Sequence, residues 1–335
     1  MSAIYIKHID VIGLLGYQNI SWDVNADVNI LGGVNGSGKS TLFHICYNLI
    51  GYGYIREEGY AQKVESVKIV FTNDFQLLWD KQAVDHNFQS DRRYVYHDLD
   101  KGRVNKEGLV TIQRTQLLDD KGEVTNPDEL VSVILTDLLS AFEQAILDSQ
   151  KVGNAEQNGD RTYLDVLLAD SIGVRNQKLS QIFINSFTRP EGEDGKKRQH
   201  QYFISAKDAR YLTLFNDALL TFFGDRYMIK SGMESQITMI SKKTNKVIAY
   251  QDLSLGEKEM LLLILRASNT FDNPVVIWLD EPDLGLHVDW QVRLVKSLKE
   301  LNPNIQLFIS THAPSMVEGN FEKVKEMSQI TTTRQ

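Results

Sequence analysis

The chain has 335 residues, of which 42% are hydrophobic and 24% are charged, and its net charge is −8 at pH 7. This is the composition of an ordinary globular protein of one large or two modest domains, and it excludes a global basic field that would attract nucleic acid. The single cysteine, Cys46, excludes an intramolecular disulfide framework, residues 1–10 lack the apolar core of a signal peptide, and no apolar run could span a bilayer. We therefore expect a cytoplasmic protein without a membrane partner, in which Cys46 is buried.

A phosphate-binding loop lies early in the chain, between a predicted strand and a predicted helix. Residues 3–31 alternate apolar and polar, which predicts a β layer that leads into a strand at 28–31. The stretch Gly33-Val34-Asn35-Gly36-Ser37-Gly38-Lys39-Ser40 then reads G-x-x-x-x-G-K-S, and apolar residues follow at helical spacing. Such a loop turns backbone N–H groups and a helix N-terminus toward a phosphate, its lysine contacts the β- and γ-phosphates, and its serine binds Mg²⁺. Together with Thr41, the stretch predicts a nucleoside triphosphate site.

The middle of the chain changes from strand patterns to helix patterns. Short strands separated by turns continue from 64 to 113 and predict an antiparallel β region. Asn126-Pro127-Asp128-Glu129 has the composition of a helix N-terminus, so we predict a helix up to about residue 150 and further helices up to 225. The chain would then consist of a P-loop part at 1–125, a helical insertion at 126–225 and a C-terminal part at 226–335 that belongs with the P-loop part.

The C-terminal part supplies acidic groups at the end of a predicted buried strand. Residues 275–279 form a continuous apolar run that ends in Asp280 and Glu281, as a parallel strand at the centre of a doubly wound sheet would. Asp280 is suited to hold Mg²⁺, and Glu281 is suited to be the general base for an attacking water. The next apolar strand, 305–309, is followed by His312, which could donate a hydrogen bond to the γ-phosphate. Glu281, His312 and Lys39 are therefore the predicted catalytic residues.

A further motif precedes the apolar helix at 260–265. In Leu253-Ser254-Leu255-Gly256-Glu257, the serine and the glutamate three residues later form a capping box. The same helix N-terminus, with Gly256 allowing a close backbone approach, predicts an anion site that contacts the γ-phosphate of a second protomer.

These motifs together resemble ABC-type ATPases of the AAA family, in the RecF, SMC and OLD branch that includes PtuA-like subunits of bacterial antiphage systems. The resemblance covers about residues 1–60 and 250–320, and it implies a P-loop α/β fold with a β-rich front lobe, a doubly wound, mainly parallel sheet and a helical insertion. It also implies that Asp283 begins a loop that meets the opposite protomer. A glutamine that senses Mg²⁺ is expected on a front-lobe strand, and Gln113 and Gln116 are both candidates.

The resemblance further implies that two protomers close head-to-tail over ATP and Mg²⁺ and separate after hydrolysis. It leaves three biological roles open. The first is control of a separate effector such as a nuclease in antiphage defence, since residues 313–335 are too few for the nuclease domain of OLD-type proteins. The second is a RecF- or SMC-like role in DNA repair or clamping, which would make nucleic acid a partner. The third, a transporter subunit, fits the signature and the β-rich front lobe least.

Overall fold

The computed structural model describes residues 3–52, 55, 60, 63–84, 110–125, 135–140, 162–187, 204–231 and 237–333. The chain divides into two compact units. The first unit consists of Met1–Ala141, Asn273–Asp283 and Asn304–Gln335, and the second consists of Phe142–Asp272 and Leu284–Pro303. Both units are therefore assembled from segments that lie far apart in the sequence.

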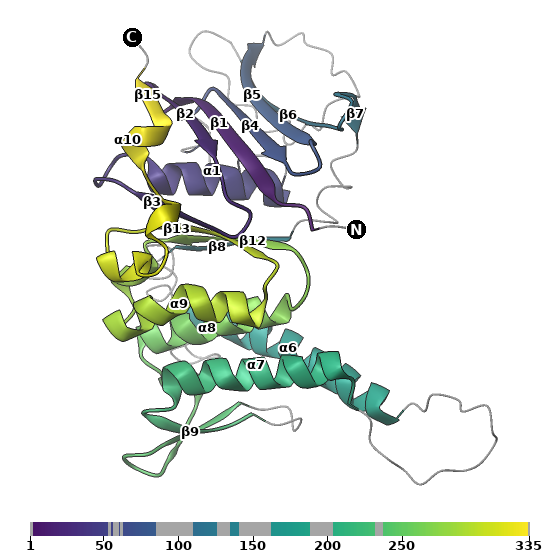
Figure 1. Ribbon diagram of the computed structural model, residues 1–335, viewed down its shortest axis with the longest axis vertical. Helices are drawn as coiled ribbons and strands as arrows, with labels where there is room; N and C mark the ends of the chain where they lie inside the picture. Colours follow the sequence, from purple (N-terminus) through teal and green to yellow (C-terminus); the bar gives the residue numbers. More distant parts are fainter. Residues whose placement is uncertain are drawn as a thin grey trace, which may run out of the picture. The chain divides into compact units, whose positions relative to one another are not determined.

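A seven-stranded antiparallel sheet forms one layer of the first unit, with the order β15-β2-β1-β4-β5-β6-β7 (Figure 1). Its strands are β1 (Ile6–Leu14), β2 (Gln18–Asp23), β4 (Ser66–Phe71), β5 (Gln76–Val84), β6 (Val110–Leu118), β7 (Val124–Thr125) and β15 (Thr331–Thr333). Buried and accessible side chains alternate along β4, as expected of a strand with one face on a core. The predicted antiparallel region is confirmed.

A five-stranded parallel sheet forms the second layer, with the order β14-β3-β13-β12-β8. Its strands are β3 (Val28–Gly32), β8 (Leu135–Ser140), β12 (Val275–Asp280), β13 (Ile305–Ser310) and β14 (Val324–Glu326). Every residue of β3, β12 and β13 is buried, which accounts for the mainly apolar sequence of these strands. The strand that leads into the P-loop lies between β13 and β14.

The helix predicted from 126 to about 150 is wrong for residues 135–140, which form strand β8 and pair in parallel with β12. Leu135, Leu138 and Leu139 have helical spacing, but so short an apolar run fits a buried strand equally well. Pairing with β12 decides the conformation, because a place at the edge of the parallel sheet outweighs local propensity. The flanking residues 126–134 and 141–161 lie outside the described part of the chain.

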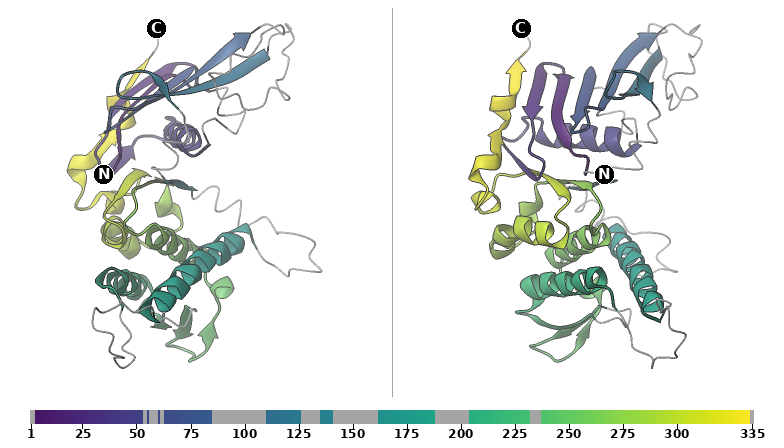
Figure 2. Two further views of the ribbon diagram at one scale, coloured as in Figure 1. Left: turned by 90° about the vertical axis from the view of Figure 1, so that its right-hand side faces the viewer. Right: turned by 45° about the vertical axis from the view of Figure 1, so that its right-hand side comes forward.

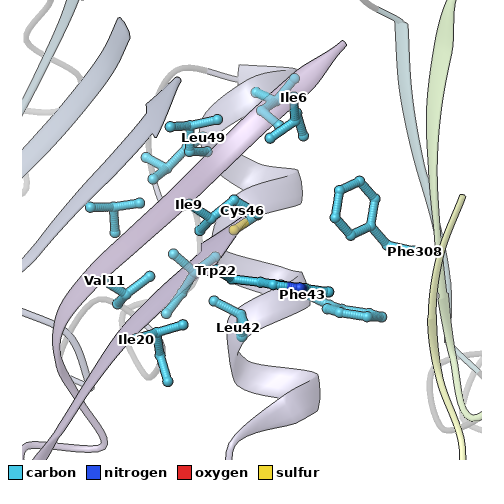
Figure 3. Packing of buried hydrophobic residues seen from close by; sticks show 14 of the residues in the cluster. Ile6, Ile9, Val11, Ile20, Trp22, Leu42, Phe43, Cys46, Leu49 and Phe308 are labelled. Carbon is cyan, nitrogen blue, oxygen red and sulfur yellow. The ribbon is translucent and has the colours of Figure 1, made fainter. Parts of the chain in front are cut away.

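Helix α1 (Lys39–Tyr52) lies between the two sheets of the first unit (Figures 1 and 2). Aromatic rings from both layers meet on it. Trp22 of β2 and Phe43 of α1 contact the Phe308 ring edge-on, with centroid distances of 5.5 and 6.4 Å (Figure 3). Trp278 of β12 stacks on the Phe308 ring, with a centroid distance of 4.1 Å. Cys46 is completely buried in the same cluster, as predicted, and burial raises the pKa of its thiol.

The second unit combines helices with a small antiparallel sheet (Figure 2). Its helices are α6 (Tyr163–Phe187), α7 (Ala206–Phe223), α8 (Leu255–Asn269) and α9 (Val288–Leu301), and its sheet consists of β9 (Tyr227–Lys230), β10 (Thr238–Ser241) and β11 (Val247–Ile248). The predicted cap of α7 is present, since the Asp208 N–H donates to Ser205 Oγ at 3.1 Å. The division into an insertion at 126–225 stays a prediction, because much of that segment lies outside the described residues. Among the helices in the described part of the chain, none has the length and apolarity needed to cross a membrane.

Candidate active site

The P-loop joins β3 to α1 and contains three glycines in a conformation that other residues rarely adopt. Gly33, Gly36 and Gly38 have φ angles of 141°, 77° and 102°. A Cβ at Gly33 would also be crowded, since it would lie 3.0 Å from Met327 Cβ. The glycines of the motif are therefore required by the backbone path of the loop.

Lys39, the first residue of α1, reaches back over the loop. Its Nζ donates to the Gly33 carbonyl at 2.7 Å and to the Val34 carbonyl at 3.3 Å, and it lies 3.0 Å from His312 Nε2. Because an ammonium only donates, Nε2 is the acceptor in this contact. Burial lowers the pKa of Lys39 and outweighs the opposing effect of nearby carboxylates, of which Glu281 contributes most. P-loop carbonyls and His312 thus hold Lys39 where the motif places a triphosphate.

Asp280 ends β12 and is only 4% exposed. Its Oδ1 accepts hydrogen bonds from the hydroxyls of Ser40, at 3.0 Å, and of Ser310. Ser310 is the register partner of Asp280 on β13, so the parallel pairing itself brings the two side chains together. The structure thus places a P-loop hydroxyl directly against the acid at the strand end.

Glu281 follows Asp280 in a strained backbone conformation. Its φ is 51°, a left-handed value that is uncommon for a residue with a side chain. Its N–H donates to both the carbonyl and the hydroxyl of Ser310, at 3.0 and 3.1 Å, which stabilises this conformation. The carboxylate lies 3.7 Å from His312 Nε2 and remains partly exposed. Strain of this kind at the end of a buried strand is typical of functional positions.

Asp283 lies in a short 3-10 turn (Pro282–Leu284) and is bound to the segment that carries His312. Thr311 Oγ1 donates to Asp283 Oδ1 at 2.6 Å and accepts from the Ala313 N–H at 2.9 Å. The hydroxyl of Thr311 therefore fixes the backbone on both sides of His312.

A cavity of about 430 Å³ lies beside the start of the P-loop. It is lined by residues from the ends of β3 and β14 and from the segment after β13. These residues are Ile30, Gly32, Gly33, Val34, Thr311, His312, Ala313, Pro314, Val317, Val324 and Glu326. The cavity thus brings His312 and the P-loop backbone to one accessible surface.

The oxygen groups at this site suit a nucleotide with a hard cation. Ser40 and Asp280 offer adjacent oxygens, which Mg²⁺ prefers, and Mg²⁺ commonly binds with one or two protein oxygens and completes its shell with phosphate and water. The described residues contain no cluster of three or more His, Cys, Asp or Glu groups that could hold a metal. Ser37 Oγ, inside the P-loop, is buried without a hydrogen-bond partner among the described residues.

The segment from Ser254 to Glu257 lies in the second unit, at the start of α8. Ser254 is the N-cap residue, and its N–H and hydroxyl both donate to Glu257 Oε2, at 2.9 and 2.8 Å. The Gly256 backbone is packed closely, because a Cβ there would lie 2.2 Å from the Gly285 carbonyl oxygen. The close packing against Gly285 of the same chain therefore explains why residue 256 is a glycine.

The structure brings together the predicted residues of the first unit: the P-loop, Asp280, Glu281, Asp283 and His312. Ser254 and Gly256 belong to the other unit.

Gln113 and Gln116 lie on β6, opposite Lys81 and Leu78, and their side chains are outside the described residues. The sequence analysis missed Ser310 and Thr311. Their place at the end of an apolar strand could have indicated them, because the residues at the carboxyl ends of neighbouring parallel strands meet at one edge of the sheet.

Comparison with known proteins identifies the family. A family described as "AAA domain, putative AbiEii toxin, Type IV TA system" matches residues 28–318, from the P-loop strand to beyond His312. The chain belongs to this AAA_21 family. The predicted kinship with AAA-type ATPases is thereby confirmed.

Three curated relatives share this family resemblance. "Retron Vc95 probable ATPase" of Vibrio cholerae serotype O1 biovar El Tor is 29% identical over 36% of this chain and 26% of its own length. "Retron Ec83 probable ATPase" of Escherichia coli is 25% identical over 48% of this chain and 30% of its own length. "Septu protein PtuA" of Bacillus thuringiensis is 22% identical over 94% of this chain and 73% of its length. The chain thus spans less than a third of the two retron ATPases that it matches.

The fold of this AAA_21 protein resembles that of Smc heads. A crystal structure of an Smc head bound to the C-winged helix domain of ScpA superposes with a TM-score of 0.50 at 14% identity, and it covers 98% of this chain and 97% of its own. The predicted P-loop α/β architecture of the SMC type is confirmed, with a parallel and an antiparallel sheet.

Proposed function

We propose that this AAA_21 protein hydrolyses ATP and acts as a nucleotide-dependent switch. The observation that carries the proposal is a chain of contacts at the P-loop: Lys39 contacts His312, His312 lies beside Glu281, and Ser40 binds Asp280. Family membership and the names of the retron relatives support ATP as the nucleotide.

Each group at the site has a role that follows from its contacts. Glu281 is partly exposed and accepts the proton of the attacking water, and Ser310 fixes its backbone. Lys39 exchanges its P-loop carbonyls for phosphate oxygens, and His312 donates to the terminal phosphate through a ring nitrogen that carries a proton. Ser40 and Asp280 would hold Mg²⁺, which neutralises charge on the phosphates.

The switch would operate between two copies of the chain. In each composite site, the P-loop of one copy holds ATP while Ser254 at the α8 N-terminus of the other binds the γ-phosphate. Such a contact exists only with ATP, so hydrolysis removes the preference for the closed pair. The N-cap position of Ser254, at the start of a 15-residue helix, supports a role in binding an anion.

The output of the switch would be a separate effector protein, such as a nuclease, in a bacterial defence system. The likeness to retron ATPases and to Septu protein PtuA supports this role.

Glu281→Gln tests the catalytic assignment. We expect ATP binding to persist and turnover to fall by roughly 10²–10⁴, the usual contribution of a general base. Steady-state phosphate release and equilibrium nucleotide binding measure the two quantities. Sedimentation with ATP and with ADP then tests the switch, since we expect the variant to pair with ATP alone. Near-normal hydrolysis would remove Glu281 from this role, and equal pairing with both nucleotides would refute the switch.

A further inference from the structure

The carboxylate of Glu257 is the centre of a buried hydrogen-bond network in the second unit. Besides the two bonds from Ser254 to Oε2, its Oε1 accepts from Tyr227 Oη at 3.0 Å and from Arg226 Nη1 at 3.1 Å. Glu257 is 4% exposed, and burial alone would raise its pKa. The four hydrogen bonds outweigh burial and hold the pKa below its ordinary value, so Glu257 is a carboxylate at neutral pH.

In this network, the Ser254 hydroxyl already donates its single proton to Glu257. A serine hydroxyl has a single O–H, and here it points to Glu257 Oε2. The oxygens of a bound triphosphate only accept hydrogen bonds. Ser254 must therefore release Glu257 before its hydroxyl can donate to a phosphate.

Arg226 and Tyr227 keep the Glu257 carboxylate hydrogen-bonded after the Ser254 hydroxyl has released it. A buried carboxylate that loses a donor is costly unless other donors remain. The Arg226 guanidinium and the Tyr227 hydroxyl bind the other oxygen of Glu257, so its charge stays paired when the Ser254 hydroxyl turns away.

Arg226 also offsets the negative charge of Glu257 toward an arriving triphosphate. Its side chain is 58% exposed, and its guanidinium carbon lies 5.9 Å from the centre of the Trp290 ring on α9. Its charge can therefore act on a ligand at the surface while the Trp290 ring supports the guanidinium.

We infer that Arg226 and Tyr227 are positioning residues for Ser254. They hold Glu257 so that the Ser254 hydroxyl can transfer from Glu257 to the γ-phosphate held by a second copy. This inference rests on the proposed function, because it requires that Ser254 meets a nucleotide bound to another protomer.

Arg226→Ala in the Glu281→Gln background tests the inference. We expect ATP-dependent self-association, measured by sedimentation over a concentration series, to weaken about tenfold, in the range expected for one charge-assisted hydrogen bond on a partly exposed group. ATP binding to the single chain should be unchanged. Tyr227→Phe should weaken association to a smaller extent, and Arg226→Lys should restore part of it. Lys246→Ala, which removes an exposed cation from the turn between β10 and β11, is the matched control.

A double-mutant cycle separates this role from simple structural support. If Arg226 acts through the charge of Glu257, Arg226→Ala should have no further effect on association in a Glu257→Gln chain. An equal loss in both backgrounds, or wild-type association of Arg226→Ala, would overturn the inference. Thermal unfolding checks the fold, and if Arg226→Ala unfolds, Arg226→Lys and Tyr227→Phe provide the same comparison. Ser254→Ala tests the proposed function separately, because normal ATP-dependent pairing of that variant would refute the composite site itself.

Discussion

One hydroxyl group at the end of β13 binds the side chain of Asp280 and the backbone of Glu281, the last residue of β12 and the residue after it. Ser310 Oγ donates to Asp280 and accepts from the Glu281 N–H, and the residue is completely buried. A carboxylate that is 4% exposed depends on such donors, because a buried charge without them is costly. Ser310 therefore stabilises both the acid beside the P-loop and the strained backbone of Glu281.

Ser310→Ala should lower the free energy of unfolding by about 1–3 kcal/mol, since it removes one hydrogen bond from a buried carboxylate. It should also lower the rate of ATP hydrolysis, because the backbone of Glu281 loses one of its two fixing contacts. Denaturant unfolding and phosphate release measure the two effects. Ser180→Ala removes a hydroxyl that bonds to its own helix α6 and should change neither quantity. Unchanged hydrolysis in Ser310→Ala would contradict the role given to this hydroxyl.

At the scale of single elements, β1 and β2 are joined by side chains on the accessible face of the antiparallel sheet. His8 Nδ1 lies 2.6 Å from Asp23 Oδ1, and His8 Nε2 lies 2.8 Å from Asp10 Oδ1. Ionised carboxylates only accept, so both ring nitrogens donate and the imidazole is charged. Burial acts to lower the pKa of His8, but the hydrogen bonds and charges of Asp10 and Asp23 outweigh it, so the pKa is raised.

A raised pKa means that the folded chain binds the His8 proton more tightly than the unfolded chain. The resulting stabilisation is present in full below the ordinary value of 6.5 and is lost as the pH rises through the folded-state pKa. A histidine NMR titration should therefore give His8 a pKa above 6.5, and Asp23→Asn should move it down. A His8 pKa at or below 6.5 in the unmodified chain would show that the two aspartates do not hold the proton.

The loop after Glu281 contains a glycine that is needed for packing. A Cβ at Gly285 would lie 1.9 Å from Glu259 Oε2, and its carbonyl oxygen lies against Gly256. Two glycines thus let the start of α8 and the segment before α9 pack backbone to backbone. In the sequence, Gly256 predicts a close approach, but sequence alone does not reveal that the approaching group is Gly285.

How far the sequence predicts this fold depends on the kind of signal in each segment. Strands β12 and β13 are mainly apolar and lie next to chemically specific residues, so their conformation is predicted correctly, and the roles of Asp280, Glu281 and His312 stay predictions. Strand β8 carries an ambiguous leucine spacing, and only its pairing with β12 makes it a strand. The edge strands β14 and β15 are three residues long and have no recognisable pattern, because their conformation depends on β3 and β2.

At the scale of the whole molecule, the proposed switch predicts a partner whose binding depends on the nucleotide. The Glu281→Gln chain, immobilised with ATP and Mg²⁺, should retain the product of a neighbouring gene and release it when ADP replaces ATP. Lys39→Ala, which removes the P-loop ammonium, should retain none under either condition. Retention that is equal with ATP and ADP would contradict control by the switch. Retention of DNA alone, with a steep dependence on salt, would favour the DNA-clamping role instead.

The position of β3 in the parallel sheet has a consequence for synthesis of the chain on the ribosome. Both strands that flank β3 come from residues 305–326, whereas the P-loop occupies residues 33–40. Nascent chains generally fold from their N-terminal parts first, but here the motif has no sheet to hold it until the later strands arrive. We therefore expect the P-loop to hold a nucleotide only after residues 305–326 have left the ribosome.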